Sequence, residues 1–286
     1  MTIDHKTLYN TEMLSKDYAS RDYLEPAERA VIEVLDSNLS SMKMLDMGVG
    51  GGRTTKYFAP LALNYTGADY AHAMINACIE KYGDDYYFIT CDARDMEELS
   101  DNSFDFVLFS FNGIDSFSHE DRISALKEIH RVLRPGGYFC FSSHNLNWNG
   151  LPDLFSLKPA KKAALANKSG ASEETKDFKK NVDRGFRSAY KIARLSILNR
   201  SFRMKGYISK LRKSERGYIY DNSLNGKVKV YYITKDEQFR QLKAAGYNNI
   251  STICRNGFIT SSTSLLNQDG WIYYLCQTGK NEKQKE

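Results

Sequence analysis

The sequence has no long uninterrupted hydrophobic run. None of its apolar stretches approaches the roughly 18 residues that a membrane-spanning helix needs, so we expect no membrane-spanning helix. Residues 1–16 are polar and lack the apolar segment of a secretory signal. We therefore expect a cytoplasmic protein without a membrane partner.

Cysteines are few and lack a pattern. The five occur at positions 78, 91, 140, 254 and 276, with no CxxC motif and no cluster of cysteine with histidine. An odd number at wide spacing excludes a disulfide framework and a structural zinc site, so we expect no metal. Four of them fall in or beside apolar runs and are expected to be buried: Cys91, Cys140, Cys254 and Cys276.

The chain also lacks a strong charge of either sign. Its net charge of +5 excludes a uniformly basic nucleic-acid-binding surface. Residues 156–216 nevertheless contain 18 basic and 5 acidic residues, a net charge of +13, which leaves −8 for the rest. This basic segment has three open interpretations: a helical lid, a cap that attracts an anionic small substrate, or an RNA-binding surface.

Apolar segments alternate between strand and helix patterns. After a helix within residues 17–40, strands are expected at 42–47, 65–68, 86–90, 104–111 and 138–142, with helices at 54–63, 72–82 and 121–133 between them. This alternation predicts a parallel sheet with right-handed crossovers. Beyond the basic segment we expect a strand at 228–233, a helix at 236–245 and an antiparallel pair at 249–254 and 271–276.

A glycine-rich loop, Gly48-Val-Gly-Gly-Gly52, follows the first expected strand. Glycines there allow a sharp turn and let a ligand approach the bare backbone. A dinucleotide fingerprint requires a third glycine at the position that Arg53 occupies, which argues against NAD. A carboxylate at Asp46 suits a ligand with a cationic amino group better than a pyrophosphate.

Two more carboxylates, Asp69 and Asp92, follow the second and third expected strands. A carboxylate at the end of the second strand can accept hydrogen bonds from ribose hydroxyls, and Asp92 could accept one from an adenine amine. With Asp46, they should converge on one crevice at the carboxyl ends of the strands. The alternative is that each caps the N-terminus of a helix.

A series of five motifs resembles that of the class I methyltransferases that depend on S-adenosylmethionine (SAM). The motifs are LDMGVGGG, GADYAHAM, CDARDM, SFDFVLFSF and RVLRPGGYF, in the expected order over residues 40–145, with a further match over 228–277. The resemblance implies a doubly wound α/β fold whose seven-stranded sheet has the order 3-2-1-4-5-7-6, with strand 7 antiparallel. It also implies SAM as the cofactor.

The resemblance assigns cofactor contacts to matching positions. Asp46, Gly48, Val49 and Gly50 would line the methionine part, and Asp69 would bind the ribose. Tyr70 and Met74 would flank the adenine, Asp92 and Ala93 would read its edge, and Ser110 and Phe111 would border the methionine moiety. The N-terminal helix should close over the cofactor, so that Tyr18 or Tyr23 reaches it.

The expected division is an N-terminal helical cap (1–40), a SAM-binding domain (41–150 and 226–280), a basic, largely helical insertion (151–225) and a disordered tail (281–286). Candidate groups for the acceptor follow strands four and five: Asp115 and His144 as catalytic residues, with Asn112 and Asn145 as substrate contacts. The motif Asn/Asp-Pro-Pro-aromatic of many DNA-base methyltransferases is absent after strand four.

We therefore expect methyl transfer by in-line displacement to a small molecule. The alternatives are an RNA or protein methyltransferase that uses the basic insertion, an aminopropyl-transfer enzyme, and a SAM-binding protein without catalysis.

Overall fold

The structure is a computed structural model that describes residues 5–155, 195, 204–221 and 223–279. Most of the basic insertion, residues 156–194 and 196–203, and the tail 281–286 lie outside the described residues. The expectations of a helical insertion and of a disordered tail therefore stay predictions.

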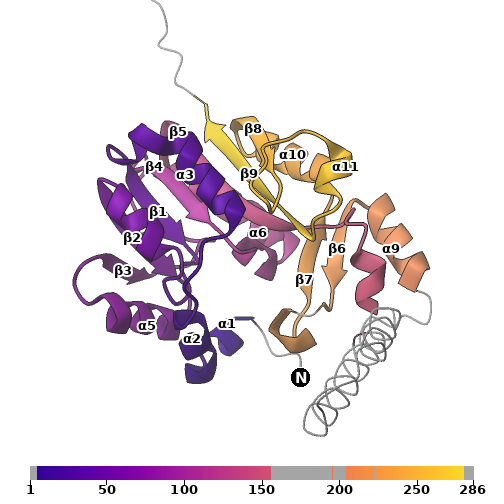
Figure 1. Cartoon of the computed structure of the whole chain (residues 1–286), viewed down its shortest axis with the longest axis horizontal. Coiled ribbons are helices and arrows are strands. Elements are labelled where there is room, and N and C mark those ends of the chain that lie inside the picture. Colours follow the sequence, from indigo (N-terminus) through magenta and orange to yellow (C-terminus); the bar gives the residue numbers. More distant parts are fainter. Residues whose placement is uncertain (1–4, 156–194, 196–203, 222, 280–286) are drawn as a thin grey trace, which may run out of the picture.

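One mixed sheet forms the centre of the molecule (Figure 1). Its strands run in the order β3-β2-β1-β4-β5-β7-β6, which confirms the predicted order 3-2-1-4-5-7-6. The bounds are β1 (Lys43–Met47), β2 (Asn64–Asp69), β3 (Tyr87–Thr90), β4 (Phe104–Phe109), β5 (Leu133–Asn145), β6 (Arg216–Ile219) and β7 (Val230–Ile233). β7 is antiparallel to β6 and parallel to β5.

Among the described residues, the sheet has nine strands rather than seven. β9 (Trp271–Thr278) runs antiparallel along β5, and β8 (Tyr247–Ile253) pairs with β9, which confirms the predicted antiparallel pair. The additional pairing is possible because β5 is longer than the predicted segment 138–142. β5 pairs with β9 along Tyr138–His144 and with β7 only at its last two residues, His144 and Asn145.

Helices cover both faces of the sheet, so the central strands are buried on both sides. α3 (Pro26–Leu39), α4 (Thr55–Phe58) and α5 (His72–Tyr82) pack on one face, where Leu35, Phe58 and Cys78 belong to one buried cluster. α6 (His119–Val132) and α10 (Lys235–Ala244) pack on the opposite face, with Leu126 and Leu242 in a second cluster.

The described N-terminal part forms three helices, of which α3 confirms the helix predicted within residues 17–40. α1 (His5–Tyr9) and α2 (Glu12–Ala19) precede α3. Pro26 occupies the first turn of α3, where its fixed φ and missing N–H are tolerated, and Glu25 and Glu28 form a reciprocal capping box there. The chain between Ser20 and Glu25 is therefore not helical.

Two other elements end earlier than predicted. β4 stops at Phe109 rather than Phe111, because Phe111 and Asn112 have positive φ angles of 55° and 61°. α4 ends at Phe58 and a short 3-10 turn, η1, that contains Pro60 follows it. The remaining elements are η1 (Ala59–Leu61), η2 (Gly113–Ser116), η3 (Leu151–Phe155), α9 (Met204–Lys213), η4 (Ser223–Gly226) and α11 (Thr263–Leu266).

All five cysteines are buried, which confirms the interpretation of Cys91, Cys140, Cys254 and Cys276 as small core residues and adds Cys78 to them. A separate small core joins the β6–β7 hairpin to α9 and η3 through Ile208, Ile219 and Tyr232. Within the described ranges, no helix is long and apolar enough to cross a membrane.

Candidate functional site

A cavity lies at the carboxyl ends of β1, β2 and β4, where the glycine loop turns. The loop needs residues without side chains at this point. Gly48 has φ +65°, and a Cβ there would lie 2.5 Å from Cε2 of Phe109. Gly50 has φ +56°, and a Cβ there would lie 3.2 Å from the Tyr18 ring. The bare backbone therefore forms part of the cavity wall, as the sequence predicted for a ligand-binding turn.

Two of the three predicted carboxylates line this cavity. Asp69 Oδ2 accepts a hydrogen bond from the Gly50 N–H at 3.0 Å, and its Oδ1 accepts one from the Ala71 N–H at 2.9 Å. Asp46 Oδ2 accepts hydrogen bonds from Thr54 at 2.5 Å and from the Tyr65 hydroxyl at 2.8 Å. Burial raises the pKa of both carboxyls to about 6, against these hydrogen bonds.

Asp92 does not line the cavity. Arg94 holds its carboxylate through two side-chain hydrogen bonds of 2.9 and 2.7 Å. Burial raises the pKa of Asp92, but the hydrogen bonds and charge of Arg94 outweigh burial, so the net shift is downward. The structure thus brings Asp46 and Asp69 together and leaves Asp92 beside them, paired with its neighbour.

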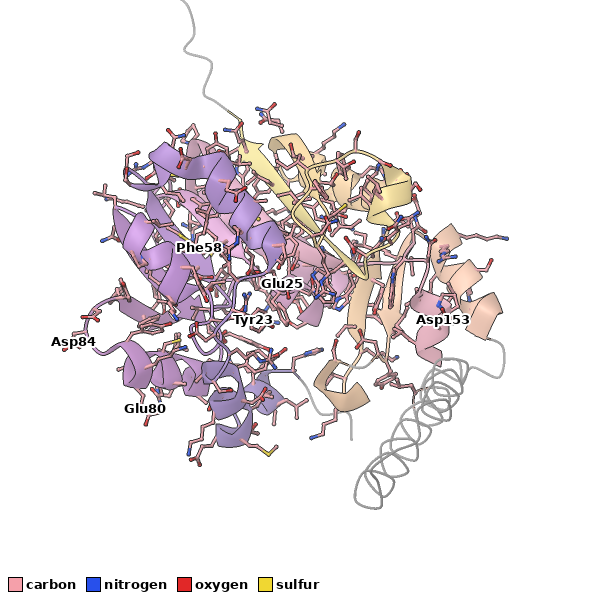
Figure 2. All side chains as sticks on the ribbon, viewed as in Figure 1. Tyr23, Glu25, Phe58, Glu80, Asp84 and Asp153 are labelled. Carbon is pink, nitrogen blue, oxygen red and sulfur yellow. The ribbon has the colours of Figure 1, made fainter. Side chains whose placement is uncertain are left out.

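Most of the other predicted cofactor residues also line the cavity: Gly48, Val49, Gly50, Tyr70, Ala93, Ser110 and Phe111. Met74 does not, because it is fully buried in α5. Of the two tyrosines considered for the N-terminal cap, Tyr18 lines the cavity. Tyr23 does not line the cavity and is 40% exposed; Figure 2 labels it beside Glu25 in the middle of the view, with the exposed Glu80 and Asp84 at the edge of the molecule.

Sequence reasoning missed an aromatic wall over the cavity. The Tyr9 ring lies 5.8 Å from that of Tyr18 and 6.2 Å from that of Tyr70, measured between ring centroids. Phe117 completes the group at 6.5 Å from Tyr70. These rings come from α1, α2 and the segments after β2 and β4, so the N-terminal helices enclose the site. No motif marks Tyr9.

Two arginines in the cavity wall were also missed. Arg21 pairs with Asp17 at 2.9 Å, and its guanidinium lies 3.9 Å from the Tyr18 ring centroid. Because the Asp17 side chain is 60% exposed, this pair is screened by water and leaves Arg21 available to an anionic group.

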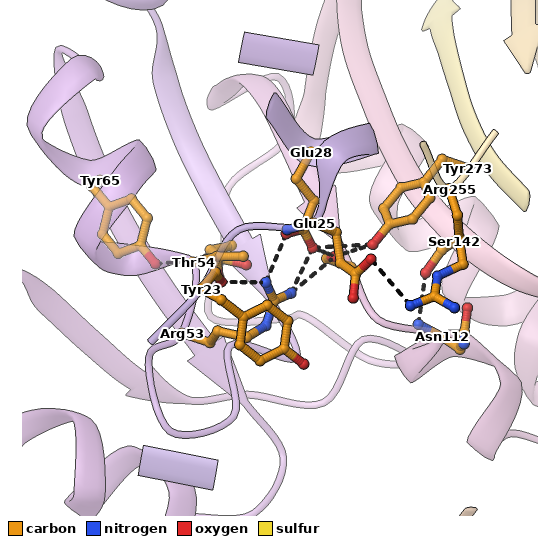
Figure 3. A network of polar contacts seen from close by, with 12 residues as sticks. Tyr23, Glu25, Glu28, Arg53, Thr54, Tyr65, Asn112, Ser142, Arg255 and Tyr273 are labelled. Carbon is orange, nitrogen blue, oxygen red and sulfur yellow. Dashed lines mark hydrogen bonds and ion pairs between the residues drawn. The ribbon is translucent and has the colours of Figure 1, made fainter. Parts of the chain in front are cut away.

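Arg53, by contrast, is fully engaged by a buried carboxylate (Figure 3). It forms two parallel hydrogen bonds with Glu28, and the hydroxyls of Ser110 and Tyr273 also donate to Glu28. Two features of the sequence could have drawn attention to this pair. Glu28 completes the capping box of α3, and Arg53 occupies the position where a dinucleotide fingerprint has its third glycine. This network fixes the wall of the cavity rather than offering charge to a ligand.

The two predicted catalytic residues contact each other. Asp115 Oδ2 lies 2.7 Å from His144 Nδ1 and accepts a hydrogen bond from the His144 N–H at 2.6 Å. Asp115 Oδ1 accepts from Arg122 at 2.6 Å and from Ser143 at 2.7 Å. Asp115 is buried, and the described contacts of its carboxylate are all with other residues of the protein. We therefore infer that Asp115 orients His144 and does not face a cavity.

The second ring nitrogen of His144, Nε2, lies 3.7 Å from Asp221 Oδ2, and the ring packs 4.8 Å from that of Tyr232. Burial lowers the pKa of His144, but the hydrogen bond and charge of Asp115 and the charge of Asp221 outweigh it, so the pKa is raised. His144 is 7% exposed and does not line the first cavity.

The two predicted substrate contacts lie nearby but outside the cavity lining. The Asn145 amide donates to the Leu266 carbonyl at 3.0 Å, so its side chain serves the fold. The Asn112 N–H donates to Ser142 Oγ at 2.7 Å, and the buried Asn112 Oδ1 has no hydrogen-bond partner among the described residues. β5 reaches Asn145, which places His144 and Asn145 in the strand rather than in the loop after it.

Comparison with known proteins agrees with this geometry. Residues 45–141 match the family model described as methyltransferase domain. A fatty-acid O-methyltransferase of Mycolicibacterium smegmatis is 28% identical over 152 residues, 51% of this chain and 53% of the relative. A phthiotriol/phenolphthiotriol dimycocerosates methyltransferase of Mycobacterium ulcerans is 30% identical over 129 residues, 44% of this chain and 45% of the relative.

A crystal structure from Thermotoga maritima, described as a SAM-dependent methyltransferase and possible histamine N-methyltransferase, superposes with a TM-score of 0.53. The alignment covers 94% of this chain and 99% of that one at 14% identity, which supports the fold alone. The curated relatives are matched over about half their length. Residues 45–141 therefore carry a methyltransferase domain, and the strand order agrees with the Rossmann-like fold that the resemblance to class I SAM-dependent methyltransferases implied.

Proposed function

We propose that the protein transfers the methyl group of SAM to a small-molecule acceptor. The observation that carries the proposal is the cavity at the strand ends, where a bare glycine turn meets two buried carboxylates under an aromatic wall. These features fit SAM: the bare turn admits a ligand to the backbone, and Asp69 provides acceptor oxygens for ribose hydroxyls. The rings of Tyr18 and Tyr70 provide surfaces for a sulfonium cation and an adenine.

Each part of the cavity would hold a different part of the cofactor. Asp69 would bind the ribose, Tyr70 and Ala93 would flank the adenine, and Gly48, Gly50 and Ser110 would lie along the methionine part. Arg21 is the cation suited to the methionine carboxylate, because its partner Asp17 is solvent-exposed. Met74 and Asp92, which do not line the cavity, would support the adenine-binding residues from behind the cavity wall.

When bound, the cofactor supplies a methyl group on a positively charged sulfur, which is an activated leaving group. The protein then has to align the acceptor with that methyl group and exclude water, a contribution of up to about 7–11 kcal/mol in the best cases. The aromatic wall from α1 and α2 excludes water. A general base is required only where the acceptor atom carries a proton that must leave.

For a hydroxyl acceptor we propose His144 as the base and Asp115 as its positioning residue. The contact with Asp115 at Nδ1 fixes the ring, and Nε2, which lies 3.7 Å from Asp221 Oδ2, is the nitrogen that an acceptor hydroxyl would have to reach. Full turnover in both His144→Ala and Asp115→Ala would remove this assignment. Asn112, whose side-chain oxygen is unpaired within the described part of the chain, is proposed as an acceptor contact, and Asn145 as a support of that region.

The names of the matched relatives favour small acceptors: one is a fatty-acid O-methyltransferase. The test is incubation of the purified protein with methyl-labelled SAM and, separately, a small-molecule extract, total RNA and a protein fraction. We expect label only in the small-molecule fraction, abolished by Asp69→Ala. Label in RNA or protein instead would support the alternative acceptors, and no label in any fraction, with intact SAM binding, would support a non-catalytic role.

A further inference from the structure

A second cavity adjoins the proposed cofactor cavity. It has a volume of about 660 Å³, within the range of small-molecule sites. The two cavities share Tyr70, Ser116 and Phe117 in their walls. Ser116 ends η2, the turn whose first residue, Gly113, lines the cofactor cavity beside Ser110. A molecule in the second cavity would therefore reach the tip of β4 along η2.

The far wall comes from the β6–β7 hairpin and from α1. Tyr218, Tyr220 and Lys229 line it from the hairpin, and His5 and Lys6 line it from α1. A ring nitrogen of His5 lies 2.8 Å from the Lys229 carbonyl oxygen, so the two elements meet and close this side. The cavity is thus built from segments more than 200 residues apart in the chain.

The cations in this wall differ in how they are paired. Arg94 is neutralised by Asp92 at 2.7 Å and by Asp121 at 3.2 Å. Lys6 and Lys229, by contrast, form no ion pair with any residue that the structure describes, although the charge of Lys6 contributes to the lowered pKa of Asp92. Lys229 Nζ lies 5.4 Å from the centroid of the Tyr220 ring. Two lysines without an ion pair and four aromatic residues, Tyr70, Phe117, Tyr218 and Tyr220, therefore line one cavity.

We propose that this cavity is the acceptor site and that the acceptor is an elongated, ring-bearing small molecule with an anionic group held by Lys6 and Lys229. The inference rests on the proposed methyltransferase function. The aromatic walls would stack on the ring of the acceptor, while the two ammonium groups hold its acid group away from the donor. The methylated atom would then lie over η2, close to Ser110.

The test uses two probes that differ by one charge, 8-anilinonaphthalene-1-sulfonate and the neutral N-phenyl-1-naphthylamine. We expect the sulfonate to bind the full-length protein saturably in the presence of S-adenosylhomocysteine, and the neutral probe to bind more weakly. Lys6→Ala and Lys229→Ala should each weaken sulfonate binding about threefold, as for exposed ion pairs, without affecting the neutral probe. Lys127→Ala, an exposed lysine of α6 outside the cavity, is the control and should change neither.

Three binding results would overturn the proposal: no sulfonate binding, displacement of the sulfonate by S-adenosylhomocysteine, or unchanged sulfonate affinity in the two lysine variants. The bound sulfonate should also block label transfer to the small-molecule extract, and transfer that continues at saturation would show that the acceptor binds elsewhere. Calorimetry with S-adenosylhomocysteine on the same samples separates the two proposals. If S-adenosylhomocysteine binds but the sulfonate does not, only the proposed acceptor site is rejected. If S-adenosylhomocysteine does not bind, the proposed methyltransferase function is rejected.

Discussion

Glu28 and Arg53 form a buried bidentate ion pair, with Arg53 Nη1 2.7 Å from Oε2 and Nη2 2.5 Å from Oε1. Glu28 has no exposed surface, and the hydroxyls of Ser110 and Tyr273 also donate to it. One carboxylate therefore connects α3, the end of the glycine loop, the tip of β4 and the last strand. The cofactor cavity depends on a contact between residues 25 positions apart that do not belong to one motif.

Removing one partner of this pair should be strongly destabilising. Arg53→Met leaves the Glu28 carboxylate buried without its cation, which costs about 3–5 kcal/mol in comparable buried pairs. Urea unfolding measures the loss. As a control, Arg240→Met removes contacts of an arginine whose side chain is 53% exposed, and should leave the free energy of unfolding nearly unchanged because water screens exposed ion pairs. Similar small losses in both variants would contradict the role given to Glu28.

Gly51 should tolerate no side chain. A Cβ there would lie 2.3 Å from the Ala19 nitrogen, so Gly51→Ala pushes α2, with Tyr18, away from the cavity. We expect binding of S-adenosylhomocysteine to weaken about tenfold or more, from a strain of about 1–3 kcal/mol. Calorimetry measures this. Gly206→Ala is the matched control, because nothing lies within 4 Å of its Cβ position in α9. An unchanged affinity in Gly51→Ala would show that α2 does not enclose the cofactor.

Cofactor affinity should increase as the pH rises through about 6. Burial raises the pKa of Asp69 to about 6, and its carboxylate is the form that accepts two ribose hydrogen bonds. We expect tighter binding of S-adenosylhomocysteine at pH 7.5 than at pH 5, with a smaller difference in Asp69→Asn. The ligand-free protein should show the opposite trend in stability. A carboxyl with a raised folded pKa binds its proton better when folded, so stability falls between about pH 4 and 6. Binding independent of pH would exclude a role for this carboxylate.

His144 should make stability depend on pH above neutrality. Its folded pKa is raised by Asp115 and Asp221 against burial, so its contribution is complete below the ordinary histidine pKa of about 6.5. That contribution is lost as the pH rises through the folded value. Urea unfolding at pH 6 and pH 8.5 should show a smaller difference in His144→Gln than in the wild type. His72→Gln, an exposed histidine of α5, serves as the control and should keep the wild-type difference.

The sequence predicted best what local pattern determines. Alternating apolar segments placed Asp46 and Asp69 at neighbouring strand ends, and the glycine spacing located the turn between them. Contacts between residues that are far apart in the sequence could not be predicted from local pattern. Tyr9 and Arg21 reach the cavity from helices that carry no motif. Asp92 lies outside the cavity lining because the side chain of its neighbour Arg94 binds its carboxylate, which would otherwise be available to a ligand. His144 was expected in a loop, because nothing in the Ser-Ser-His-Asn segment signals that pairing with β9 extends β5.

The most direct test of the central claim is a calorimetric titration of the wild type and of Asp69→Ala with S-adenosylhomocysteine and with NAD. We predict one binding site for S-adenosylhomocysteine in the wild type, a marked loss of affinity in Asp69→Ala, and no binding of NAD to either protein. Binding of NAD without S-adenosylhomocysteine, or equal affinity of both proteins for S-adenosylhomocysteine, would contradict the assignment of this cavity.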